Sequence, residues 1–122
     1  MEFLIKKTLL LFIALLSWTA IQANHISGAN IEYECLGGGS YRVTLNVFQD
    51  CEDITVAPTQ NLRAVPDCNF GFFSFSLPLI SNVEVSQLCS SLILQSECNG
   101  GLLPGKRHLT YQGLVNIPST CP

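Results

Sequence analysis

The sequence has few charged residues and few residues suited to acid–base chemistry. Only 12% of its 122 residues are charged, and the formal net charge is −3. An acidic chain lacks the basic face that nucleic acid requires, so we expect no nucleic-acid partner. His25 and His108 are its only histidines, and catalysis by imidazole or zinc binding would have to use one of them. We interpret His108, which follows Lys106 and Arg107, as an exposed residue at the start of a strand.

The motifs of common catalytic and cofactor sites are also missing. No CxxC pair is present, which argues against a zinc ribbon, a redox motif or haem attachment. Gly37-Gly38-Gly39 is not followed by Lys and Ser or Thr, so it predicts a turn and not a phosphate-binding loop. Ser40 lacks the second glycine of a nucleophile elbow. The sequence therefore predicts a protein that is not an enzyme and has no cofactor.

The first 23 residues have the pattern of a secretory signal peptide. Two lysines precede the unbroken apolar run Leu9 to Leu16, and Ala23 is a small residue just before the expected cut. An uncleaved membrane anchor is the alternative, but the apolar run is shorter than the ~18 to 20 residues of a spanning helix. We therefore expect residues 24–122 to be secreted or displayed on the cell surface, with no membrane contact after cleavage.

The cysteines all follow the predicted signal peptide. An even number in a short exported chain indicates a set of disulfides, and their spacing favours this over a metal or catalytic role. Six cysteines allow 15 pairings, among which the sequence does not choose. We expect disulfides at Cys35, Cys51, Cys68, Cys89, Cys98 and Cys121.

Alternation of apolar and polar residues predicts several strands. A hairpin is expected over residues 30–50, and further strands at residues 70–77, 82–85 and 108–117. The segment SQLCSSLIL between them predicts either a short helix or a loop. Strands separated by turn signals and joined by several bridges are typical of an antiparallel β-sandwich of the immunoglobulin-like kind, here a single all-β domain over residues 24–122.

Two clusters have a functional and a structural interpretation. Asp50-Cys51-Glu52-Asp53 offers carboxylates to calcium but lacks the regular spacing and glycine of an EF-hand, so a solvated loop is preferred and no metal is predicted. Phe70, Phe72, Phe73 and Phe75 offer ring faces to a sugar, but phenylalanine has no polar group, which favours core packing.

Three segments together resemble a known kind of module. They are NHISGANIEYECLGGGSYRVTLNVFQDC, SQLCSSLILQSECNGG and GKRHLTYQGLVNIPSTC. They are similar to the N-terminal module of large secreted surface proteins of Bacteroidota, which carry a His-Ile-x-Gly-Gly segment, a Tyr-x-Cys-Leu-Gly-Gly hairpin and a Val-Tyr-x-Asp-Cys strand end. Here Ala29 replaces the second glycine of the first motif, and Phe48 replaces the tyrosine of the third.

The resemblance implies a long polypeptide with PKD-like or immunoglobulin-like repeats and a gliding-motility-associated C-terminal domain, exported by type IX secretion. Because such proteins continue beyond the module, we expect this chain to be truncated at its C-terminus. The resemblance supplies no catalytic residues.

We therefore predict a non-enzymatic, adhesin-like structural module of a bacterial cell-surface or secreted protein. Its loops at residues 50–67 and 99–107 would meet a glycan, another surface ligand or neighbouring domains of a longer chain. A small stand-alone secreted effector or inhibitor, rich in disulfides, is the alternative, and a secreted hydrolase is a third hypothesis.

Overall fold

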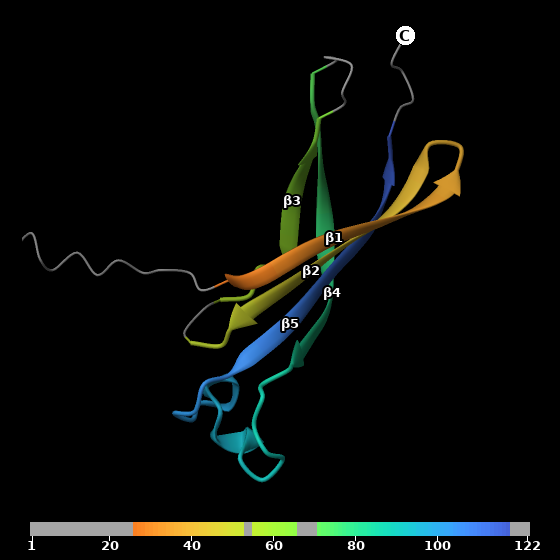
Figure 1. Cartoon of the computed structure of the whole chain (residues 1–122). Helices are drawn as coiled ribbons and strands as arrows, with labels where there is room; N and C mark the ends of the chain where they lie inside the picture. The colour runs from red at the N-terminus through yellow and green to blue at the C-terminus, as the bar shows by residue number, and fades with distance from the viewer. Residues whose placement is uncertain (1–25, 53–54, 66–70, 118–122) are drawn as a thin grey trace, which may run out of the picture.

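The computed structural model describes residues 26–52, 55–65 and 71–117 (Figure 1). The predicted signal peptide lies outside these residues, as do His25, Asp53, Cys68, Phe70 and Cys121. Within them, no helix is long and apolar enough to cross a membrane.

In the described part of the chain, five antiparallel strands form one sheet in the order β1-β2-β5-β4-β3. Two short 3-10 helices lie in the segment between β4 and β5. The elements are β1 Ile26–Gly37, β2 Ser40–Asp50, β3 Thr59–Ala64, β4 Phe73–Glu84, η1 Ile93–Gln95, η2 Glu97–Asn99 and β5 Lys106–Asn116.

The predicted hairpin and the last predicted strand are confirmed. Gly37, Gly38 and Gly39 form the β1–β2 turn with φ values of 92°, 61° and 80°, a left-handed conformation that glycine adopts without steric cost. β5 ends before Pro118, which has no N–H to donate to a sheet.

The two strands predicted at residues 70–77 and 82–85 are one continuous strand, β4. Its first half pairs with β3 and its second half with β5, and the register shifts between Leu79 and Ser81. Pro78 lies within β4 and pairs with Thr59 of the edge strand β3. β3 itself was missed because TQNLRA is largely polar.

The described strands form one bent sheet, so the second layer of a sandwich is not found among the described residues. Figure 1 shows β3 and the first half of β4 running at a steep angle to β2 and β5, whereas the second half of β4 runs beside β5. The bend in β4 thus lets one sheet cover part of itself, where two sheets were expected.

The core lies between this β3–β4 hairpin and one face of β2 and β5. Leu77 of β4 is fully buried and packs over Gly113 of β5, where an added Cβ would lie 3.0 Å from the Leu77 Cδ2. Phe73 and Phe75 are partly buried against the core, whereas Phe72 is 56% exposed. The other buried apolar residues of the cluster are Val43, Leu45, Val47, Leu109, Tyr111 and Val115.

Candidate functional site

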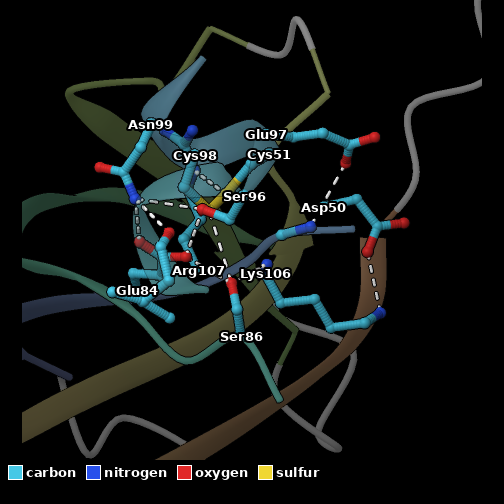
Figure 2. The surroundings of a disulfide bond; sticks show 12 residues. Asp50, Cys51, Glu84, Ser86, Ser96, Glu97, Cys98, Asn99, Lys106 and Arg107 are labelled. Carbon is cyan, nitrogen blue, oxygen red and sulfur yellow. Dashed lines mark hydrogen bonds and ion pairs between the residues drawn. A yellow bond between two sulfur atoms is a disulfide. The ribbon is translucent and has the colours of Figure 1, made fainter. Parts of the chain in front are cut away.

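The segment between β4 and β5, residues 85–105, folds against one end of the sheet, and we call it the 85–105 loop. A disulfide between Cys51, directly after β2, and Cys98 in this loop joins positions 47 residues apart (Figure 2). The Cys51 side chain is buried, and its N–H donates to the carbonyl oxygen of Gly105 at 2.9 Å. The end of β2 is therefore fixed to both the middle and the end of the loop.

The remaining cysteines do not form a second bridge among the described residues. Cys35 in β1 and Cys89 in the 85–105 loop carry free, exposed thiols. The two lie at opposite ends of the sheet and cannot bond to each other, so the disulfides expected at these two positions stay a prediction. The expectations for Cys68 and Cys121 concern residues outside the described part.

The carboxylate of Glu84, at the end of β4, accepts hydrogen bonds from three side chains of the 85–105 loop. The Glu84 Oε1 accepts hydrogen bonds from the hydroxyls of Ser86 and Ser96, both at 2.6 Å, and its Oε2 accepts one from the Asn99 amide at 2.8 Å (Figure 2). Ser96 is fully buried. The hydrogen bond from Ser86, followed by that from Ser96, lowers the pKa of Glu84, and the positive charge of Arg107 adds to this.

Close backbone packing completes the loop. The Glu97 N–H donates to the carbonyl of Leu103 at 2.8 Å, and the Leu103 N–H donates to that of Gln95 at 2.9 Å. Gly101 lies so close to this pair that an added Cβ would stand 2.0 Å from the Gln95 carbonyl oxygen. Only glycine therefore fits at position 101 without displacing the Gln95 backbone.

A cleft of about 470 Å³ lies beside the disulfide, between this loop and the segment after β2. The exposed carboxylate of Glu52 and that of Glu97 stand at it, and Leu102 forms part of its rim with 95% of its surface exposed. Leu94, elsewhere in the loop, is 78% exposed. The site thus combines two carboxylates at the cleft with leucine side chains that are exposed to solvent.

The sequence predicted the loop that carries Leu102 but did not single out Leu102 itself. The predicted binding loop 99–107 included it, but only as part of a turn marked by glycines and a proline. Glu84, Ser86 and Ser96 were not recognised, because serines and a lone glutamate show no periodicity and meet only after the loop has folded back on β4.

Asp50, at the end of β2 and the start of the predicted acidic cluster, contacts a cation of the protein itself. The Asp50 Oδ1 accepts hydrogen bonds from the Lys106 ammonium at 2.8 Å and from the Ser27 hydroxyl at 3.2 Å. No group of three or more possible metal ligands occurs among residues 26–52, 55–65 and 71–117. Since Lys106 already meets the Asp50 carboxylate, the calcium interpretation gains no support.

Two other residues considered from the sequence lie away from this site. His108 lies in β5, half-buried, with its ring stacked on Phe48 at 4.6 Å between centroids and its Nε2 at 2.9 Å from the Asn46 Oδ1. It is therefore a member of the sheet and less exposed than expected. The Ser40 hydroxyl donates to the Asn116 Oδ1 at 2.6 Å, next to the β1–β2 turn.

Comparison with known proteins adds no relative to this picture. No protein-family model, no curated protein and no solved structure matches the chain. The similarity to surface proteins of Bacteroidota rests on the motifs of the sequence alone and stays a prediction.

Proposed function

We propose that the chain is a non-enzymatic, adhesive module of a bacterial cell-surface or secreted protein, and that the 85–105 loop is its contact surface. The observation that carries this proposal is Leu102, a large apolar side chain 95% exposed on a loop that a disulfide holds in place. A loop ordered before binding loses little conformational entropy when a partner docks, so its apolar side chains contribute more of their burial energy to affinity.

The charge of the cleft narrows the class of ligand. Glu52 and Glu97 make its surroundings negative, which disfavours acidic ligands and suits neutral or basic ones. A neutral glycan or a neighbouring protein domain fits this requirement.

An exported location is part of the proposal. Disulfides persist in oxidising compartments, and the Cys51–Cys98 bond agrees with the signal-peptide pattern of residues 1–23. The motifs shared with gliding-motility-associated proteins of Bacteroidota lie in the β1–β2 hairpin and at the end of β2, which favours type IX secretion and display on the surface. A neighbouring domain would then supply the second sheet of an immunoglobulin-like sandwich.

The test is binding of the exported chain to a panel of neutral glycans and to cell-surface extract. Leu102→Ser removes the rim side chain, and we expect about tenfold weaker binding, because one interface anchor is worth about 1–2 kcal/mol. Leu114→Ser is the matched control, since Leu114 is also a 72% exposed leucine but lies in β5. Equal binding by both variants, or none by the wild type, would refute the adhesive role.

A further inference from the structure

A second cleft, of about 860 Å³, lies where the 85–105 loop meets the end of β2 and the start of β5. We call it the Phe48 cleft. It shares Glu52 and Glu97 with the cleft beside the disulfide, so the two clefts adjoin. The other side chains that line it include Phe48, Asp50, Val85, Leu88, Pro104 and Lys106.

The apolar part of the Phe48 cleft lies on the side of the sheet away from the core. Phe48 follows the buried Val47, so it points to the opposite side, where its ring stacks on that of His108. It is still 39% exposed. Val85 is 40% exposed, and its N–H donates to the carbonyl oxygen of Lys106 at 2.8 Å. These contacts hold the two apolar side chains in place at the cleft.

The polar part of the Phe48 cleft carries more negative than positive charge. Asp50, Glu52 and Glu97 bring carboxylates to it, and Lys106 brings an ammonium group that lies 2.8 Å from the Asp50 Oδ1. The Glu97 Oε2 accepts a hydrogen bond from the Gly105 N–H at 3.3 Å. Within the described residues, neither Glu52 nor Glu97 forms an ion pair. Two carboxylates therefore remain whose charge a ligand can neutralise.

The disulfide fixes the backbones that carry these two carboxylates. Glu52 follows Cys51 and Glu97 precedes Cys98, and the Cα atoms of the two cysteines are 4.8 Å apart. Figure 2 shows the carboxylates of Glu97 and Asp50 on the same side of this disulfide. Because the cleft is ordered before a partner arrives, binding requires little ordering of the protein itself.

We infer that the Phe48 cleft binds a basic, amphipathic peptide segment of a partner protein. A lysine or arginine side chain of this segment meets Glu52 and Glu97, and an apolar side chain beside it covers Phe48 and Val85. The inference rests on the proposed binding role of the module and names the partner that this surface takes.

The two halves of the cleft favour this ligand over the other classes. An acidic segment is repelled by the carboxylates, and a neutral glycan leaves their charge uncompensated. A polar basic segment leaves the rings and aliphatic side chains of the cleft in water, so the ligand needs apolar side chains as well. The volume of about 860 Å³ lies within the range of about 300–1,000 Å³ for ligand pockets, which suits a few side chains of an extended segment.

Titration of the exported chain with synthetic peptides tests the inference. The probe is a short acetylated and amidated peptide of alternating lysine and leucine, compared with a lysine–serine and a glutamate–leucine peptide of the same length. We expect the lysine–leucine peptide to bind most tightly and the glutamate–leucine peptide not to bind in calorimetry at low salt. Affinity for the lysine–leucine peptide should fall as salt is added, because exposed charges are screened.

A matched pair of double variants locates the charge contact. Glu52→Gln with Glu97→Gln should weaken binding of the lysine–leucine peptide about fivefold to tenfold, because two exposed ion pairs are lost. Glu32→Gln with Glu34→Gln makes the same change in net charge on β1, away from the cleft, and should leave the affinity within about twofold.

A second pair locates the apolar contact. Val85→Ser should weaken binding of the lysine–leucine peptide about fivefold and leave that of the lysine–serine peptide unchanged, because only the former covers this side chain. Val65→Ser is the control, since Val65 is an exposed valine after β3. Thermal midpoints of all variants show that each is folded.

The outcomes separate this inference from the adhesive role. Equal weakening by the two double variants would overturn it, since the charge contact would then be nonspecific. A wild type that binds cell-surface extract or a neutral glycan through Leu102, but not the lysine–leucine peptide, would overturn it and leave the adhesive role standing. Peptide binding lost in the Glu52 and Glu97 variant would support it even if Leu102→Ser bound extract like the wild type.

Discussion

Strands β1 and β2 are paired residue by residue, yet they differ completely in burial. In β2, Val43 and Leu45 are 6% and 7% exposed, while their partners Tyr33 and Ile31 in β1 are 76% and 58% exposed. Pairing decides the side to which a residue points, but burial depends on what lies over that side. Leu77 and its neighbours in β4 lie over β2 and β5. Alternation in a sequence therefore identifies a strand without showing whether its apolar face is covered.

Truncation of the covering side chain gives the largest expected effect. Leu77→Ala leaves a cavity above Gly113 and should lower the free energy of unfolding by about 3–5 kcal/mol. Ile31→Ala on β1 is the matched control and should cost within about 0.5 kcal/mol, as exposed positions do. Urea denaturation measures both. Similar costs at the two positions would show that β1 is covered in the native protein.

Removal of the Cys51–Cys98 disulfide should have the second-largest effect on stability, because this bond holds the end of β2 covalently. The double change Cys51→Ala with Cys98→Ala should cost about 2–4 kcal/mol, since the bond closes a long loop in the unfolded chain. The same denaturation curves, recorded without reductant, measure the loss. An unchanged midpoint would mean that the Glu84 contacts and the packing of Gly101 hold the 85–105 loop without the bond.

A smaller effect should separate Tyr111 from Tyr33. The buried Tyr111 hydroxyl donates to the carbonyl oxygen of Ala57 at 2.9 Å. Tyr111→Phe should cost about 0.5–1.5 kcal/mol, because a partly buried hydrogen bond to Ala57 is lost. Tyr33→Phe on exposed β1 should change the thermal midpoint very little. An equal shift in both variants would contradict the difference in burial.

The pH dependence of stability should distinguish two glutamates. The pKa of Glu84 is lowered by its hydrogen bonds, so the folded state binds a proton less readily than the unfolded state. Its stabilising contribution is present above the ordinary value of 4.5 and is lost as the pH falls through the lowered pKa. Glu84→Gln should reduce the loss of stability in acid.

Glu34→Gln is the control for this titration. Glu34 lies on β1 and pairs with Arg42 at the surface, where ion pairs contribute little. Thermal midpoints between pH 3 and 7 check the comparison. If Glu84→Gln and the wild type lose stability in parallel as the pH falls, the hydrogen bonds to Glu84 do not favour its charged form.

The local sequence pattern by itself determined two strands and one turn of this protein. The alternation of β2 and β5 predicted those strands and which of their residues face the core. The glycines at 37–39 predicted the turn that allows positive φ. Both features depend on neighbours within a few residues, so the sequence alone is enough to show them. It also predicted Cys51 and Cys98 as disulfide cysteines, without their pairing.

Tertiary structure decided the rest. Among the described residues one sheet bends in β4 and no second layer is found. The pairing of Cys51 with Cys98 joins residues 47 apart, and Glu84 meets Ser96 only where the loop folds back. Each of these depends on contacts between segments distant along the chain. Such contacts form only when the whole backbone settles on one arrangement, so no local run of residues encodes them, and the exposed face of β1 shows the difference most directly.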